Sequence, residues 1–168
     1  MNKTGTGYWK TLLAAPILLA LLLVFAPSAP AHDGLDLEKA VKVGSGKVMV
    51  IEFTDPDCPF CRRAEAYFQG KPQVTRYIFF LPLKSHPGSK GKVQYILSAK
   101  DKAKAYLEVA AGRFDQRKLA EISPEGVKLQ REHQEMARAN KIDSTPTFMI
   151  YGRIIKGLDL RTIEPLLK

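Results

Sequence analysis

The sequence predicts an α/β domain with a mixed β-sheet, and three observations support this prediction. Two apolar runs rich in β-branched and aromatic residues, 47–54 and 74–81, are typical of buried strands. Residues 58–69 lie between them and have a helical pattern that ends at Gly70-Lys71-Pro72. Strand, helix and strand in this order favour a parallel βαβ unit. Near the C-terminus, residues 147–156 predict an antiparallel hairpin, which makes the sheet mixed.

The ends of the domain have weaker signals. Residues 33–43 suit either a short helix or a lead-in strand, because apolar residues alternate irregularly with charged ones. In the hairpin, residues 147–151 and 153–156 flank a single glycine, which predicts a tight turn. Residues 160–167 predict a closing helix.

A helical block is predicted between the second strand and the hairpin. Residues 83–91 read as a loop, and residues 92–111 have apolar side chains at helical spacing, which predicts one helix. Residues 116–120 fit one helical turn. Ser123 is a suitable N-cap for a further helix over 124–140, with proline at its first position.

The N-terminus is typical of a secretory signal peptide. Lys3 and Lys10 precede residues 11–26, an apolar stretch without charge, and Ala29-Pro30-Ala31 follows as a small-residue cleavage site. We expect cleavage after Ala31, which leaves 137 residues for export to a bacterial periplasm. The alternative is an uncleaved anchor in the inner membrane, although the apolar run is shorter than the roughly 20 residues that span a bilayer.

Charge narrows the range of partners. The chain carries a net charge of +9, and its basic residues are spread out with a mild cluster over 84–104. No arginine-rich block with interleaved aromatic residues is present in the sequence, so we do not expect nucleic-acid binding. The basic residues indicate either a solvated basic surface or attraction to acidic partners or anionic lipid.

The only two cysteines, Cys58 and Cys61, form a CxxC motif at the predicted strand-to-helix junction. The first sulfur then lies at a helix N-terminus, where the backbone N–H groups and the helix dipole favour the thiolate that attacks disulfides. Outside the cytosol a cysteine pair usually forms a structural disulfide. A disulfide that closes so short a loop stabilises the fold little. We therefore predict a redox disulfide, Cys58–Cys61.

Two metal-based interpretations of this motif are weaker. A zinc site would need His86 and His133 as remote ligands, and their spacing from the cysteines is not that of common zinc sites. These histidines have no motif around them, and we expect them at the surface or in loops. Haem attachment requires a histidine where Arg62 stands. We expect no metal and no organic cofactor.

Four segments resemble periplasmic thiol–disulfide oxidoreductases of the DsbC/DsbG type. They are the run Phe53-Thr54-Asp55-Pro56-Asp57-Cys58-Pro59-Phe60-Cys61, the helical residues 96–112, the run Ser144-Thr145-Pro146-Thr147, and residues 152–158. The resemblance covers roughly residues 47–168. It implies a thioredoxin-like fold with a helical insertion, at about 84–140, between the second core strand and the cis-proline loop.

The resemblance also implies roles for individual residues. Cys58 is expected to be the nucleophile and Cys61 the resolving thiol. Pro59 and Phe60 are expected to tune the redox potential. The bond before Pro146 is expected to be cis, and Thr145 to pair with an extended substrate strand.

Glu52 is an unexpected acid within the first apolar strand. Many thioredoxin-fold enzymes have a buried acid at this offset, six residues before the first cysteine. Burial raises the pKa of a carboxyl group, which would suit Glu52 to shuttle a proton for Cys61. The alternative is an exposed strand position. Around the motif, Arg62 and Arg63 would favour the thiolate, and Asp55 and Asp57 would oppose it.

We expect three parts: a signal segment over 1–31, a lead-in over 32–46, and the thioredoxin-like domain over 47–168. Only about 15 residues lie between residue 32 and the first strand, so we expect the catalytic domain without the family's N-terminal dimerisation domain. Ser98 stands where DsbC has one cysteine of a second disulfide.

The expected activity is thiol–disulfide exchange on protein substrates, and the resemblance implies a membrane electron donor of the DsbD type. A reductase dedicated to one client, such as an apocytochrome or a secretion component, is an alternative within redox chemistry. A non-enzymatic, chaperone-like binder is the alternative outside it.

Overall fold

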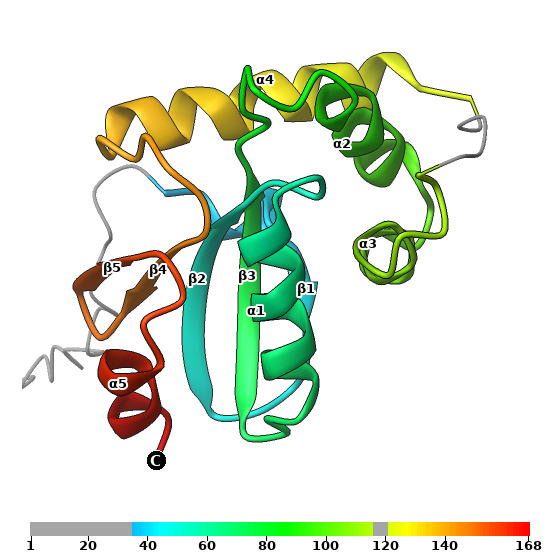
Figure 1. Ribbon diagram of the computed structural model, residues 1–168. Helices are drawn as coiled ribbons and strands as arrows, with labels where there is room; N and C mark the ends of the chain where they lie inside the picture. The colour runs from blue at the N-terminus through cyan, green and yellow to red at the C-terminus, as the bar shows by residue number, and fades with distance from the viewer. Residues whose placement is uncertain (1–34, 116–120) are drawn as a thin grey trace, which may run out of the picture. The chain divides into compact units, whose positions relative to one another are not determined.

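The computed structural model describes residues 35–115 and 121–168 (Figure 1). The predicted signal segment over 1–31 and the predicted helical turn over 116–120 lie outside these residues. The described part contains a five-stranded sheet in the order β1-β3-β2-β4-β5. The strands are β1 Val41–Val43, β2 Val48–Thr54, β3 Val74–Phe80, β4 Thr147–Ile150 and β5 Arg153–Lys156. β2 and β3 are parallel and the other pairs are antiparallel, so the predicted mixed sheet is confirmed.

Helices pack on both faces of this sheet. They are α1 Pro59–Gln69, α2 Ser89–Ser98, α3 Lys102–Ala110, α4 Pro124–Ala139 and α5 Leu160–Ile163, with short 3₁₀ helices at Leu37–Lys39 and Glu164–Leu167. Figure 1 shows α1 in front of β2 and β3, with α5 beside the β4–β5 hairpin. Within the described residues, no helix is both long and apolar enough to cross a membrane.

The single helix predicted over 92–111 is wrong, because two helices occupy this stretch and α2 begins inside the predicted loop. The chain is extended at Ala99, and Asp101 caps α3 by accepting a hydrogen bond from the Lys104 N–H at 2.9 Å. Aspartate competes for backbone N–H groups at helix starts, which explains the break. The apolar period continues across the break, so periodicity alone does not show it.

Two shorter elements also differ from the prediction. Residues 33–43 were expected to form either a helix or a strand, and the described part contains both the 3₁₀ helix and β1. The closing helix predicted over 160–167 is α-helical only to Ile163 and continues as 3₁₀ helix. Pro165 has no N–H to donate to the α-helical pattern, which accounts for the change.

Apolar side chains fill three clusters around the sheet. α1 contributes Ala64 and Phe68 to the cluster on one face of the sheet, together with the ends of β2, β4 and the C-terminal helices. α4 contributes Met136 and Ala137 to the cluster around Phe53 of β2 on the other face. The helical block supplies the third cluster beside β1 and β3. α1 is therefore held against the sheet by the packing of Ala64 and Phe68.

His133 is fully buried, so its expected surface or loop position is wrong. Its Nδ1 accepts the Phe80 N–H at 3.1 Å, and its Nε2 donates to the Lys39 carbonyl at 2.9 Å. The ring also packs against Phe79 and Phe80. His133 thus joins α4 to the end of β3 and to the N-terminal 3₁₀ helix, and this arrangement requires a neutral imidazole.

We predict that His133 makes the fold sensitive to acid. Burial lowers the pKa of His133 to about 4, from the usual value near 6.5. Between these values the unfolded chain binds more protons, so stability is complete above about pH 6.5 and falls as pH drops toward 4. The loss by pH 4.5 is about 2 to 3 kcal/mol. Urea unfolding of the wild type and His133→Gln at pH 7 and pH 4.5 measures it. The variant should lose less stability than the wild type over this interval, and equal losses would contradict the prediction.

Candidate active site

The CxxC motif lies where β2 ends and α1 begins. Cys58 is the N-cap of α1 and Pro59 is the first helical residue, a position that suits proline because its missing N–H would be unpaired there. The Cys58 N–H donates to the Asp55 carbonyl at 3.0 Å, and the Arg62 N–H donates to the Cys58 carbonyl at 3.1 Å. These bonds hold the first cysteine at the positive end of the helix.

Both thiols are free, and both are largely shielded from solvent. Cys58 is 5% exposed and Cys61, one turn further along α1, is 2% exposed. The Cys58 Sγ donates to the Thr145 carbonyl at 3.7 Å, and the Asp55 N–H donates to the Cys61 Sγ at 3.5 Å. Burial raises the pKa of Cys61 well above its usual range, and the neighbouring hydroxyl groups and the Asp55 N–H oppose this only in part. Cys61 therefore needs help to lose its proton.

The Thr145–Pro146 peptide bond is cis, as predicted. The Gly157 N–H donates to the Pro146 carbonyl at 2.7 Å, and the Thr147 hydroxyl donates to the Ser144 carbonyl at 2.7 Å. The loop is thus tied to the exit of the hairpin and places the Thr145 backbone against Cys58. It is the Thr145 carbonyl that contacts this sulfur.

Glu52 is completely buried, which excludes the alternative of an exposed strand position. Its Oε2 accepts a hydrogen bond from Arg76 of β3 at 3.0 Å. Arg76 also donates to Glu65 of α1 at 2.8 Å, so one buried guanidinium serves two carboxyl groups. Because the three side chains carry two potential negative charges and one positive charge, both acids are fully neutralised only if one of them holds a proton.

The environment favours Glu52 as the acid that holds the proton. Burial raises its pKa, and the nearby Glu65 raises it further, while Arg76 acts in the opposite direction. The Glu52 Oε1 is buried without a hydrogen-bond partner. Thr54 lies two residues further along β2, so its side chain is on the same face as Glu52, and its buried hydroxyl also has no hydrogen-bond partner; it acts to lower the pKa of both Glu52 and Cys61. The buried acid and the buried thiol thus share one neighbour.

Asp55 is a part of the site whose connections were not predicted. Its carboxylate is fully buried and accepts hydrogen bonds from the Asp57 N–H, the Leu83 N–H, the Ser89 hydroxyl and the His86 ring, at 2.6 to 2.9 Å. His86 is 31 residues away in the chain and has no motif around it, so the sequence gives no signal of this pairing. Asp55 therefore connects the cysteine loop to the loop between β3 and α2.

Arg62 does not act on the cysteines as a free charge. Its guanidinium forms two hydrogen bonds with Asp115, at 2.6 and 2.7 Å, and a third with Asp57 at 3.2 Å. Lys92 of α2 contacts the same two carboxylates, each at 2.5 Å. The two cations hold the pKa of Asp115 well below its usual range. Two positive and two negative charges therefore balance beside the motif.

Phe60, within the motif, is 53% exposed, and the Arg63 guanidinium lies 4.3 Å from its ring centroid. Two further apolar side chains are exposed on the hairpin, Tyr151 and Ile154. A polypeptide could therefore meet an aromatic side chain directly beside the buried sulfurs.

Metal ligation has no support within residues 35–115 and 121–168, where no group of three suitable side chains gathers. Both ring nitrogens of His133 are already used in the fold. His86 uses Nδ1 to contact Asp55. The reactive groups that the structure places at this site are the two neighbouring thiols.

A family model described as a thioredoxin-like domain matches residues 35–158, most of the chain. The chain belongs to the thioredoxin-like family. The predicted thioredoxin-like fold is therefore confirmed, with α2, α3 and α4 inserted between β3 and the cis-proline loop.

Individual thioredoxin-like relatives extend this assignment. A disulfide interchange protein from Neisseria gonorrhoeae has a solved structure that is 30% identical, with a TM-score of 0.68, over 79% of this chain and 96% of that one. A periplasmic thioredoxin-like protein from Salmonella enterica shares the fold at 20% identity and a TM-score of 0.58, over 79% of this chain and 89% of that one.

A curated protein from Bordetella parapertussis, named "Probable thiol:disulfide interchange protein DsbC", is 35% identical over 81 residues. That match covers 47% of this chain and 29% of the relative, so the chain spans less than a third of the relative's length. The resemblance to DsbC-type disulfide interchange proteins is confirmed by these matches.

Proposed function

We propose that this chain is an exported thiol–disulfide oxidoreductase that exchanges disulfides with protein substrates through Cys58 and Cys61. The observation that carries the proposal is the placement of two free thiols at the start of α1, with the first against the Thr145 carbonyl. A thiol pair one helical turn apart can close a disulfide and reopen it, and the short loop leaves it easy to reduce.

The reductive direction runs in two displacements. The Cys58 thiolate attacks one sulfur of a substrate disulfide, forming a mixed disulfide and releasing one substrate thiolate. Cys61 then loses its proton and attacks the Cys58 sulfur, which releases the second substrate thiolate and leaves Cys58–Cys61 oxidised. The substrate has gained the two electrons that the protein has lost. The reverse sequence oxidises a substrate dithiol.

Several side chains support these displacements in the proposal. Glu52, in its ionised form, accepts the Cys61 proton in the second step, aided by its position next to Thr54. The backbone of Thr145, before the cis bond to Pro146, pairs with an extended substrate strand beside the exposed Phe60. Pro59 and Phe60 set the redox potential, since neither donates a polar group to the sulfurs.

The cellular setting is part of the same proposal. The basic and apolar N-terminal segment would direct export to a periplasm and be removed after Ala31. Residues 32–46 then lead into the domain over 47–168, with the helical insertion at about 84–140. A membrane electron donor of the DsbD type would return the cysteine pair to the dithiol form for reductase or isomerase work.

The test is a redox titration of the purified protein in glutathione buffers. We expect a single two-electron transition that involves both cysteines. A potential of about −120 to −200 mV would indicate an oxidant or isomerase, and one near about −270 mV a reductase. The protein should also catalyse the reduction of a disulfide-bonded substrate protein. Failure of Cys58 and Cys61 to form a disulfide anywhere in this range would overturn the proposal.

A further inference from the structure

A small pocket lies beside His86, the ring that donates to the Asp55 carboxylate. It has a volume of about 230 Å³, and its lining comes from the loop between β3 and α2, from one residue of α2 and from one residue of α4. The lining residues are Pro82, Leu83, Lys84, His86, Pro87, Lys90 and Gln134. Pockets that hold a whole drug-sized molecule are about 300 to 1,000 Å³, so this one is suited to a single chemical group.

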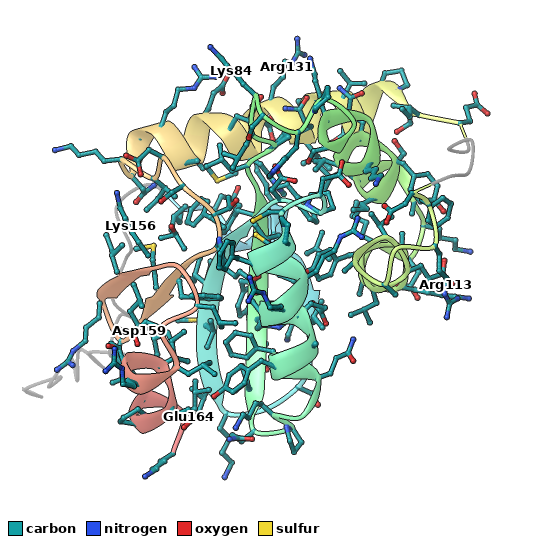
Figure 2. All side chains as sticks on the ribbon, in the orientation of Figure 1. Lys84, Arg113, Arg131, Lys156, Asp159 and Glu164 are labelled. Atoms are coloured by element: carbon teal, nitrogen blue, oxygen red, sulfur yellow. The ribbon has the colours of Figure 1, made fainter. Side chains whose placement is uncertain are left out.

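The pocket is lined by basic side chains and by no acidic one. Lys84, His86 and Lys90 contribute the basic groups, and neither lysine forms an ion pair with any residue in the described part of the chain. Figure 2 shows Lys84 directed away from the ribbon beside α4. Because like charges repel, an anion between these groups would be attracted and would relieve the repulsion.

Gln134 presents a donor to the same pocket. Its Oε1 already accepts a hydrogen bond from the Gln130 side chain at 2.5 Å. Gln130 in turn accepts one from Gln94 of α2 at 3.1 Å. This chain of amides fixes the side chain so that its NH₂ group, which can only donate, remains for a ligand.

The loop that carries Lys84 and His86 is held in place from inside. Two of the four groups that donate to the buried Asp55 carboxylate belong to it, the Leu83 N–H and the His86 ring, and a third, the Ser89 hydroxyl, belongs to the first residue of α2. Pro82 and Pro87 restrict its backbone further. The backbone that carries these basic side chains is therefore already ordered, which lowers the entropy cost of binding a ligand.

We propose that this pocket is a binding site for an anionic group of carboxylate or phosphate chemistry. Lys84 and Lys90 supply the charge, Gln134 donates from α4, and the Nε2 of His86 is the ring atom left to meet the ligand, to which it donates when the ring is protonated, because Asp55 engages Nδ1. The occupant would then lie one side chain away from Asp55, whose backbone contacts both cysteines. Carboxylate groups of a substrate polypeptide and free small anions share this chemistry.

The test is a titration of the full chain with inorganic phosphate at constant ionic strength, followed by nuclear magnetic resonance. We expect saturable shifts of the His86 ring and the Gln134 side-chain amide, with a dissociation constant of about 1 mM, which corresponds to about 4 kcal/mol. Lys84→Gln and Lys90→Gln should each weaken binding at least about fivefold. Shifts that rise linearly without saturation would overturn the proposal.

A matched control separates a local site from the general basic character of the chain. Lys128 is an exposed lysine of α4 that pairs with Glu132 at 3.7 Å and does not line the pocket. Lys128→Gln removes the same charge, and phosphate binding should stay within about twofold of the wild type. Equal weakening by all three variants would overturn the proposal. Unchanged spectral dispersion shows that each variant is folded.

Two competition titrations identify the source of the anionic group that binds. Acetate and a disulfide-bonded peptide with acidic flanking residues are each titrated in competition with phosphate. Competition by the acidic peptide and not by its amide-substituted counterpart assigns the site to substrate carboxylates. Competition by acetate alone assigns it to small anions. These readouts measure binding only, so they do not depend on whether the proposed redox activity is found.

Discussion

Replacing Cys61 by serine is expected to trap the protein on its substrate. Cys58 would still attack a substrate disulfide, because its position at the start of α1 and its contact with Thr145 are unchanged. The resulting mixed disulfide would have no internal thiol to resolve it. Incubation with a disulfide-bonded substrate should therefore yield a covalent adduct visible by non-reducing electrophoresis, while turnover falls to background.

The matching variant is Cys58→Ala. It leaves Cys61, which is buried and has a raised pKa, as the only thiol, so we expect neither adduct nor turnover. Adduct formation by Cys58→Ala would contradict the assigned order of the two cysteines. The same variant tests the alternative of a chaperone-like binder, because suppression of aggregation that survives the loss of Cys58 would not require the cysteines.

Replacing Glu52 by glutamine is expected to slow the second displacement by about a hundredfold near neutral pH, at the lower end of what proton transfer contributes. The variant keeps the shape of the side chain and leaves Arg76 paired with Glu65. It removes the group that we propose takes the Cys61 proton. Single-turnover decay of a preformed mixed disulfide isolates this step from substrate binding.

The pH dependence gives a second readout of the same role. Glu52 accepts a proton only when ionised, and its pKa is raised by burial, so the wild-type rate should rise with pH through that pKa. Glu52→Gln should lose this rise and depend only on ionisation of Cys61 itself. The first displacement, which does not use Glu52, should stay the same in both proteins.

Glu65→Gln is the control for charge in the buried cluster. It removes the same charge from the same arginine, but Glu65 lies on α1, whereas Glu52 lies on β2 two residues from Thr54. Because Glu65 raises the pKa of Glu52, its loss should shift the pH profile to lower pH and leave the maximal rate within a few-fold. Slowing equal to that of Glu52→Gln would assign the effect to the ion cluster and not to proton transfer.

The parts of the fold that were predicted correctly have local signals. The strands β2 and β3 are continuous apolar runs. The helix α1 begins within the CxxC motif, at Pro59, a residue that suits the first position of a helix. The cis bond before Pro146 was expected from the resemblance and is present. In each case a few adjacent residues determine the local structure, so the sequence is sufficient to predict it.

The parts that were missed depend on contacts between distant residues. His133 has the sequence context of an exposed helix residue and is buried because β3 and the Lys39 carbonyl offer partners to both ring nitrogens. The pairing of Asp55 with His86 has the same origin. The break between α2 and α3 is the exception, since Asp101 is a local capping signal that the continuing apolar period obscured.

The buried carboxylate of Asp55 also limits how the redox motif can be transplanted. The tetrapeptide Cys58-Pro59-Phe60-Cys61 is short enough to insert into almost any strand-to-helix junction. Its electrostatic surroundings are not contained in those four residues, because three of the groups that solvate Asp55 come from the loop after β3 and from the first residue of α2. A recipient scaffold with the motif alone would leave that carboxylate unsolvated or absent. Protein engineers would need to move the two loops together as one discontinuous cassette.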